Sequence, residues 1–375
     1  MTAIPQGSTI GILGGGQLGR MTAMAARSMG YRVQVMDPDP SCPARFVVDA
    51  CFVGSWDDAR AAGDLARGSD VITLEIEQIS IASLEAAERH APVRPGKEIL
   101  HMVQDRIRQK DWLRGHGFPL GNYRPIYSEA DLASAIAELG ERIFLKRAYG
   151  GYDGRGQVKM NRREDAAPAW HSLGEAPCVA EQAFDLQAEI SVMVARNPSG
   201  QILAYPAATN HHEQQILVWS ALPSLLPAGM EKQAQDLATT MAHQLKLEGL
   251  LAVEMFVTAG DGLYVNELAP RPHNSYHASQ RCCVTSQFEQ AVRAICDLPL
   301  GDASIMRPAA IANLLGDLWL KEDPDFARAL SVPEVSVHLY EKHTARAGRK
   351  MGHLSATADT ARQAVARVLQ ARNLL

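Results

Sequence analysis

Short apolar runs alternate with helical stretches in the first part of the chain. Residues 8–13 form an apolar run, a glycine-rich turn follows at 14–19, and a helical stretch leads to a second apolar run at 31–36. A third run lies at 71–74. Strands that alternate with helices indicate a parallel sheet covered by helices. We expect this first unit to end near Pro95.

Paired strands dominate the middle of the chain. Residues 98–117 are expected to be helical and basic, and Ser128 followed by Asp131 indicates the start of a helix that reaches Leu139. The strands expected here are 142–147, 178–184, 188–196, 201–207, 251–258 and 263–270, with a helix over 229–247. After Leu300 the pattern alternates again, and a final helix is expected from Thr357. The predicted domains are 1–95, 96–300 and 301–375.

Composition excludes several classes of protein. Of the 375 residues 46% are hydrophobic and 21% are charged, which excludes a disordered or fibrous chain. No apolar run approaches the roughly 20 residues of a membrane helix. The net charge of -5 provides no overall attraction for nucleic acid or acidic lipid. Six cysteines without a recognisable signal peptide predict reduced thiols in a cytoplasmic protein.

The glycine-rich turn admits two interpretations. Gly14, Gly16 and Gly19 have the spacing of a dinucleotide-binding turn, and Asp37 follows at the end of the next predicted strand. The turn could therefore hold a pyrophosphate at a helix N-terminus. It could equally be a glycine turn that binds another anion or no ligand, and the turn alone does not separate the two.

A lysine followed by a glycine-rich loop suggests a phosphate site. Lys146 ends a predicted strand, and GGYDGRGQ follows at 150–157. The glycines allow backbone amides to approach phosphate oxygens closely, and Arg155 adds positive charge. Asp153 would repel phosphate, so we expect the loop to contact a second substrate as well.

The hairpin that joins residues 251–258 to 263–270 brings two acids together. If Ala259–Gly262 form the turn, Thr258 pairs with Leu263 and Met255 with Asn266. Glu254 then faces Glu267, with Cβ atoms about 5 Å apart. Two carboxylates on apolar strands need a cation or a proton between them. Magnesium carried by nucleotide phosphates fits best, although a solvated acid or pairing with an arginine such as Arg271 is the alternative.

Two further clusters carry polar groups. Arg271-Pro272-His273-Asn274 follows the hairpin at once and suggests a reaction centre. The segment 343–353 is a basic patch in an acidic chain, with Arg346, Arg349 and Lys350. It is typical either of a solvated loop or of a pocket for a substrate phosphate.

Together these features resemble the ATP-grasp superfamily, and within it the N5-carboxyaminoimidazole ribonucleotide synthetases of purine biosynthesis. The matching stretches are GILGGGQLGRM, GGYDGRGQ, NELAPRPHNS, TSQFEQAVRAI and RKMGH, which extend from residue 10 to residue 353. The common family form continues Asn-Ser-Gly-His, whereas this chain has Tyr276 before His277. The resemblance implies a Rossmann-like preATP-grasp domain, an ATP-grasp domain and a small C-terminal domain. It also implies that the glycine turn lies at a ribotide pocket and does not bind NAD.

The implied reaction is the ATP-dependent carboxylation of 5-aminoimidazole ribonucleotide by bicarbonate through carboxyphosphate. It gives N5-carboxyaminoimidazole ribonucleotide, ADP and phosphate. The implied cofactors are ATP and Mg²⁺, and the implied assembly is a homodimer. Alternatives are another ATP-grasp enzyme, such as a formate-using ribotide transformylase or a biotin carboxylase, an NAD-dependent oxidoreductase, or a non-enzymatic nucleotide sensor.

The resemblance also implies roles for individual residues. The implied catalytic residues are Asp153, Arg155, Arg271 and His273. The implied metal ligands are Glu254 and Glu267. The ATP contacts are Arg106, Lys146, Gly151, Tyr152, Asp153, Gly154, Arg155, Gly156, Gln157, Glu181, Gln182, Ala183, Phe184, Glu189, His212, Asn266 and Glu267. The ribotide contacts are Gly15, Gln17, Leu18, Glu75, Tyr152, Asp153, Asn274, Lys342, Arg349 and Lys350.

Overall fold

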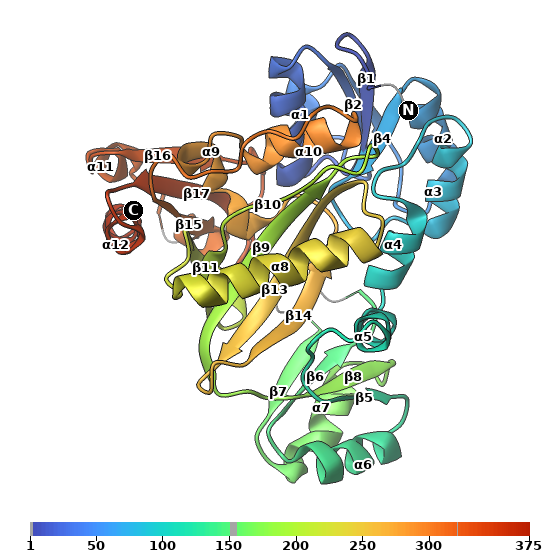
Figure 1. Ribbon diagram of the computed structural model, residues 1–375, viewed down its shortest axis with the longest axis vertical. Coiled ribbons are helices and arrows are strands. Elements are labelled where there is room, and N and C mark those ends of the chain that lie inside the picture. Colours follow the sequence, from blue (N-terminus) through green and yellow to red (C-terminus); the bar gives the residue numbers. More distant parts are fainter. Residues whose placement is uncertain (1–2, 151–155, 321) are drawn as a thin grey trace.

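The computed structural model describes residues 3–150, 156–320 and 322–375, and in these residues it contains three β-sheets (Figure 1). The predicted site residues Gly151, Tyr152, Asp153, Gly154 and Arg155 lie outside the described ranges.

The N-terminal unit is the expected parallel sheet with helices. Its strands are ordered β3-β2-β1-β4, and β1 pairs in parallel with both β2 and β4. Its elements are β1 (Thr9–Leu13), α1 (Gln17–Ser28), β2 (Arg32–Asp37), the short 3₁₀ helix η1 (Pro43–Val47), β3 (Ala50–Val53), α2 (Ala59–Arg67), β4 (Val71–Leu74) and α3 (Ile81–Glu88). Strand β3 was not predicted, because it is a half-exposed edge strand without a continuous apolar run.

The helical stretch expected over 98–117 is divided into α4 (Lys97–Val103) and α5 (Arg106–Gly115). Asp105 causes the division, because its side chain accepts hydrogen bonds from the backbone N–H groups of Ile107 and Arg108 and so begins a new helix. The first turn of α5 therefore starts with Arg106.

A small antiparallel sheet follows, in the order β5-β8-β6-β7. Its elements are β5 (Tyr123–Ile126), α6 (Glu129–Leu139), β6 (Ile143–Arg147), β7 (Gln157–Met160), η2 (Arg163–Asp165), α7 (Ala166–Ser172) and β8 (Cys178–Gln182). The cap at Ser128 is confirmed, since its side chain accepts a hydrogen bond from the N–H of Asp131. Residues of α6 and α7 share one apolar cluster with the strands, and the unit forms the lower lobe in Figure 1.

The large sheet has nine strands in the described residues. The order is β14-β13-β9-β11-β12-β15-β17-β16, with β10 beside β9, so the C-terminal strands continue the sheet of the middle segment. Its elements are β9 (Leu186–Arg196), β10 (Ile202–Ala204), β11 (Ala208–Glu213), β12 (Ile216–Leu222), α8 (Ala228–Gln244), β13 (Gly249–Thr258), β14 (Leu263–Ala269), η3 (Asn274–Tyr276), α9 (Ser279–Cys282), α10 (Gln287–Ile295), β15 (Ala309–Leu315), η4 (Gly316–Leu318), α11 (Phe326–Leu330), β16 (Val335–Leu339), β17 (Lys350–Thr357) and α12 (Ala361–Arg372). Helix α12 begins later than expected because β17 extends to Thr357.

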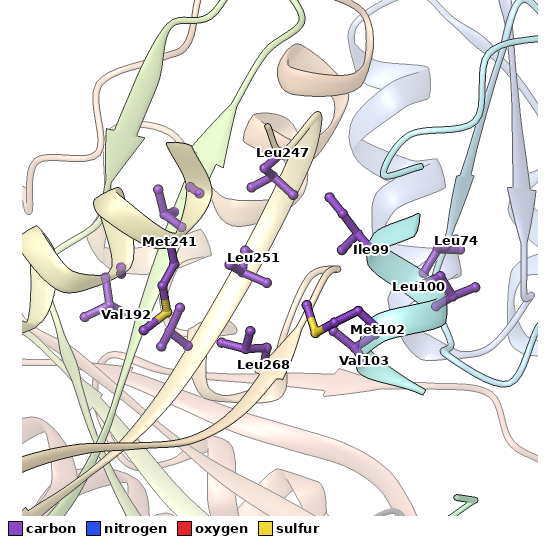
Figure 2. Packing of buried hydrophobic residues seen from close by; sticks show 14 of the residues in the cluster. Leu74, Ile99, Leu100, Met102, Val103, Val192, Met241, Leu247, Leu251 and Leu268 are labelled. Carbon is purple, nitrogen blue, oxygen red and sulfur yellow. The ribbon is translucent and has the colours of Figure 1, made fainter. Parts of the chain in front are cut away.

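Helix α4 packs between the N-terminal unit and the hairpin β13–β14. Ile99 and Val103 of α4 belong to one buried cluster with Leu74 of β4 and with Leu251 and Leu268 of the hairpin (Figure 2). Close packing of this kind leaves little room for relative displacement. The cluster therefore fixes the position of the glycine turn relative to the hairpin that carries Glu254 and Glu267. None of the helices in the described part of the chain is long and apolar enough to cross a membrane.

Three histidine rings stack in the interior beside β17. The ring of His353 lies 4.8 Å from that of His277 and 4.5 Å from that of His338, and its Nδ1 is 2.7 Å from the hydroxyl of Tyr340. Burial and the neighbouring His338 and Lys350 lower the pKa of His277 to about 3. Burial lowers the pKa of His353 and of His338 as well. The three imidazole rings are therefore uncharged near pH 7, and they would have to become charged inside the protein at low pH.

We predict that this stack makes the fold sensitive to acid. A histidine whose pKa is depressed in the folded state stabilises the fold above its ordinary value near 6.5, and the contribution is lost as the pH falls towards 3. His277→Asn removes the packing of the ring, so it should lower the free energy of unfolding at pH 8. The free energy of unfolding of the native protein should fall between pH 7 and pH 4, and the variant should reduce that fall by on the order of a few kcal/mol. Denaturant unfolding at several pH values measures both effects, and parallel curves for the variant and the native protein would contradict the prediction.

Candidate active site

The predicted pairing of Glu254 with Glu267 is present, but the register that leads to it differs from the one expected. Val257 pairs with Leu263, not Thr258, and Met255 pairs with Val265, not Asn266. A bulge between Glu254 and Met255 restores the alignment, so that Glu254 faces Glu267. The expected pairs Thr258–Leu263 and Met255–Asn266 are therefore wrong. The one-residue shift at the turn and the bulge compensate for each other, so the pairing of the two acids is as expected.

The bulge also places Asn266 on the same side as the acids. Successive residues of a regular strand point to opposite faces, and a bulge re-aims one of them. The Nδ2 of Asn266 lies 3.4 Å from Glu254 Oε2, and its Oδ1 lies 3.4 Å from Lys146 Nζ. Asn266 thereby links the hairpin to β6 of the small sheet.

The two hairpin acids lie in different electrostatic environments. Burial opposes the ionisation of Glu267, but Arg106, whose guanidinium is 2.9 Å from Glu267 Oε2, outweighs it and lowers the pKa of that carboxyl. Burial raises the pKa of Glu254, and the Glu267 and Glu189 carboxylates add to the rise against the opposing effect of His212. Glu254 is thus the acid that would gain most from a bound cation.

Glu181, at the end of β8, is shared by two lysines. Its Oε2 lies 3.1 Å from the Nζ of Lys146 and 3.1 Å from the Nζ of Lys110. Burial disfavours the carboxylate, but Lys110, Lys146 and Arg106 prevail and lower the pKa of Glu181 to about 2. Lys110 is a site residue that the sequence reasoning missed. Its spacing of four residues from Arg106 on one helix face was the available signal.

The residues predicted for the adenosine side lie at the ends of β8, β9 and β11. Ala183 and Phe184 line a cavity of about 370 Å³, and the Phe184 ring stacks on Tyr264 at 4.6 Å. Glu189 Oε2 lies 2.8 Å from the Nδ1 of His212. Burial opposes the positive charge of His212, but Glu189 raises its pKa above the usual value.

Gln182 and the described part of the glycine loop complete this side. Gln182 accepts a hydrogen bond from Asn122 at 3.0 Å, and it is not among the residues that line the cavity. Gly156 has φ +74°, which favours glycine, and Gln157 begins β7 opposite Lys146. The loop therefore returns to the sheet beside the lysine.

Arg271, His273 and Asn274 follow β14 directly. Arg271 Nε lies 2.7 Å from Glu77 of the N-terminal unit, and His273 Nε2 lies 3.4 Å from Glu254. Burial and the Arg271 and Lys350 charges hold the pKa of His273 well below its usual value, so the imidazole is neutral near pH 7.

Asn274 is buried, and neither its Oδ1 nor its Nδ2 has a hydrogen-bond partner in the described structure. A buried amide without partners is costly, and its polar atoms are suited to contact a bound polar ligand. Tyr276 is also fully buried, and its hydroxyl lies 2.7 Å from the backbone carbonyl oxygen of Pro206 and 2.9 Å from that of Ser191, either of which can accept its proton. Its φ is not positive. The tyrosine therefore needs no left-handed backbone in place of the family's glycine.

The glycine turn holds a carboxylate of the protein itself. Glu75, which follows β4, accepts hydrogen bonds from the N–H groups of Gly16 and Gly19, the latter at 2.6 Å. Asp37 accepts one from Gly15 at 2.7 Å. These amides are the ones that a dinucleotide pyrophosphate would occupy. The NAD interpretation of the turn is therefore not supported.

The other predicted ribotide residues lie near this turn or on the C-terminal segment. Gln17 and Leu18 begin α1, and Lys342 lies close enough to Glu75 to influence its pKa, which burial raises. The Nζ of Lys342 donates to the backbone carbonyl of Lys350, and Lys342 lines a cavity of about 460 Å³. Arg349 donates to the carbonyl of Thr344. Lys342 and His343 thus lie against the N-terminal unit, where they line this cavity with Phe46.

Three parts of the chain match known domain families. Residues 7–104 match the ribonucleotide synthetase preATP-grasp domain, 111–288 the ATP-grasp domain, and 309–367 the phosphoribosylaminoimidazole carboxylase C-terminal domain. The N5-carboxyaminoimidazole ribonucleotide synthase of Bacillus subtilis is 40% identical over 351 residues, which cover 93% of this chain and 91% of the relative. The chain belongs to this synthase family.

Other relatives and solved structures agree with this membership. The synthase of Brucella melitensis is 38% identical and covers 94% of this chain and 97% of its own. The ADP complex of one N5-carboxyaminoimidazole ribonucleotide synthetase superposes with a TM-score of 0.94 at 40% identity, over 99% of this chain and 98% of the other. A synthase structure from Aspergillus clavatus, in complex with ADP and 5-aminoimidazole ribonucleotide, superposes with a TM-score of 0.91 at 31% identity, over 98% of each chain.

Membership of the synthase family confirms the predicted fold class and enzyme class. The chain has an ATP-grasp fold with a preATP-grasp domain at its N-terminus and a small C-terminal domain, and it is an ATP-grasp ligase. The roles of the individual site residues remain predictions, and so do the domain boundaries at 95/96 and 300/301.

We predict that Glu267 is essential for the use of metal-bound nucleotide. Glu267→Gln removes the charge that faces Glu254 while it keeps the shape of the side chain. A metal-assisted phosphoryl transfer depends on several kcal/mol of charge stabilisation, so kcat/KM for ATP should fall on the order of a hundredfold or more. Steady-state kinetics over a range of magnesium concentrations measure this loss.

The matched control for Glu267 is Glu213→Gln, which removes an exposed carboxylate on β11. This variant should retain the native magnesium dependence. Native metal dependence in Glu267→Gln itself would remove Glu267 from the predicted ligands.

Proposed function

We propose that this chain carboxylates 5-aminoimidazole ribonucleotide with bicarbonate in an ATP-dependent reaction. Carboxyphosphate is the intermediate, and N5-carboxyaminoimidazole ribonucleotide, ADP and phosphate are the products of this step of de novo purine biosynthesis. Family membership over 93% of the chain is the observation that carries the proposal. The site geometry supports it, because acids of β8 and β14 pair with cations of α5 and β6.

In this proposal the phosphates of ATP bind at Lys146 and Arg106, which point at the hairpin from β6 and α5. Phosphoryl transfer needs mainly positioning and neutralisation of charge, and buried cations provide both. The adenosine of ATP contacts Ala183, Phe184 and Glu189. The side chain of Gln182 accepts a hydrogen bond from Asn122, so it would hold the pocket wall in place as well as contact the nucleotide.

The donor set of the hairpin fits magnesium. Glu254 and Glu267 offer carboxylate oxygens, which Mg²⁺ prefers, and the raised pKa of Glu254 reflects a buried acid that a cation would stabilise. The described residues contain no group of three or more His, Cys, Asp or Glu side chains arranged around one metal position. Nucleotide phosphates would therefore complete the coordination, and the bound ion would neutralise charge on the transferred phosphoryl group.

The acceptor side is assigned by the same reasoning. Glu75, Gln17 and Asn274 would line the ribotide, and Lys342, Arg349 and Lys350 would hold its 5′-phosphate. Arg271 and the neutral His273 would hold carboxyphosphate beside the amine. Asp153 and Arg155 keep the roles predicted from the sequence, those of orienting or deprotonating the amine and of binding the intermediate.

Two broader features belong to the proposal. We expect a homodimer, which sedimentation analysis of the purified protein would test. We also expect a cytoplasmic location, in keeping with six cysteines that are all unbonded.

The reaction is tested by the release of ADP. We expect release only when ATP, bicarbonate and 5-aminoimidazole ribonucleotide are all present, because each takes part in a bond-forming step. Replacing bicarbonate with formate should abolish the release. Equal ADP release without the ribotide, or with formate in place of bicarbonate, would contradict the proposed function.

The basic patch gives a second test. Arg349→Ala should raise the KM for the ribotide about tenfold or more and leave the KM for ATP within about threefold, since loss of a charge-assisted contact to phosphate affects one substrate. Arg362→Ala on the exposed face of α12 is the matched control and should have native kinetics. An unchanged ribotide KM in Arg349→Ala would mean that Arg349 does not bind the ribotide phosphate and that the patch is a solvated surface loop.

A further inference from the structure

Two lysines share a single carboxylate oxygen in the interior of the site. Lys146 from β6 and Lys110 from α5 both lie 3.1 Å from Oε2 of Glu181. The exposed fractions are 7% for Lys146, 4% for Lys110 and 8% for Glu181, so none of the charges is well solvated. The second oxygen of Glu181, Oε1, has no hydrogen-bond partner in the described residues. One anion therefore compensates two buried cations.

The two lysines have different further contacts. Lys146 Nζ also reaches Asn266 Oδ1 on the bulged hairpin, beside Glu254 and Glu267. Lys110 Nζ lies on the other side, 5.7 Å from the centre of the Tyr123 ring on β5. Lys146 is therefore the lysine directed at the proposed metal and phosphates, while Lys110 stays behind Glu181.

A ligand phosphate changes the charge balance of this group. If Lys146 moves its ammonium group from Glu181 to a phosphate oxygen, Glu181 loses one of its two cations. A buried carboxylate left without a cation is strongly unfavourable. The transfer of Lys146 is therefore favourable only if another cation stays on Glu181.

We infer that Lys110 is a positioning residue that keeps Glu181 neutralised and so frees Lys146 to bind the phosphates of ATP. This inference rests on the proposed function only in assigning Lys146 to the phosphates. Lys110 itself touches no substrate in this account. Its effect reaches the nucleotide through Glu181 and Lys146.

The test uses the full-length protein and two measurements. Direct titration with ATP by calorimetry gives the Kd without any turnover, and steady-state kinetics give kcat and the KM for ATP. Lys110→Met should raise both the Kd and the KM for ATP at least tenfold and change kcat less, because Lys146 stays bound to Glu181. Lys110→Arg keeps the charge and should stay within about threefold of the native values.

The pH dependence separates charge compensation from a packing defect. In Lys110→Met one cation fewer opposes the effect of burial, so the pKa of Glu181 should rise, and protonation of Glu181 as the pH is lowered should release Lys146. The ATP Kd of Lys110→Met should then approach the native Kd as the pH is lowered from 8 to 5. A defect that only disturbs packing would leave the ratio of the two Kd values constant, and that result would overturn the inference.

The double variant Lys110→Met/Glu181→Gln gives an independent check. Without the carboxylate the second cation is no longer needed, so the double variant should bind ATP within about threefold of Glu181→Gln alone. Additive losses in the double variant would overturn the inference. Lys232→Met, which removes an exposed lysine paired with Asp236 on α8, is the matched control and should bind ATP as the native protein does.

Failure of this inference and failure of the proposed function give different results. If native protein binds ATP but releases no ADP with bicarbonate and the ribotide, the function is wrong, while the calorimetric comparison still decides the role of Lys110. If native protein turns over and Lys110→Met binds ATP normally, Lys110 has no positioning role.

Discussion

The site depends on the compensation of charges that are buried together. Lys110, Lys146 and Glu181 lie together in a region with little access to water, and Arg106 beside them pairs with the partly exposed Glu267. Each buried charge is stable only beside an opposite one. The partners come from α5, β6, β8 and β14, so neutralising the charges also holds the small sheet against the hairpin. The electrostatics that prepare a nucleotide site thus also join parts of the fold.

The same constraint explains the glycine turn. Helix N-termini attract anions, and in this chain Glu75 from the end of β4 occupies the amides of Gly16 and Gly19. A turn with the spacing of a dinucleotide site is thereby closed to a pyrophosphate. Lys342 of the C-terminal segment lies close enough to Glu75 to influence its pKa, so this segment meets the N-terminal unit near the turn. Similar local sequence therefore serves different chemistry, because a distant acid fills the anion position.

Much of the organisation follows from local patterns. The alternating strands of the first unit, the cap at Ser128 and the hairpin with opposed acids were all predictable, because periodicity, capping and turn spacing act over a few residues. Less predictable were the edge strand β3, which lacks an apolar run, and the division of α4 from α5 at Asp105. The hairpin is instructive, since Glu254 and Glu267 do face one another although the pairs nearer the turn are shifted.

The sequence by itself determined the family and the fold class, and it named most of the residues of the candidate site, whose roles remain predictions. Long specific stretches such as GGYDGRGQ and NELAPRPHNS carry that information without any coordinates. Only the tertiary structure decided that Glu75 fills the glycine turn, that a bulge turns Asn266 towards the acids, and that Lys110 shares Glu181 with Lys146. These contacts join residues far apart in the chain, and their geometry is set by how α4, α5 and the sheets pack, which no local pattern encodes.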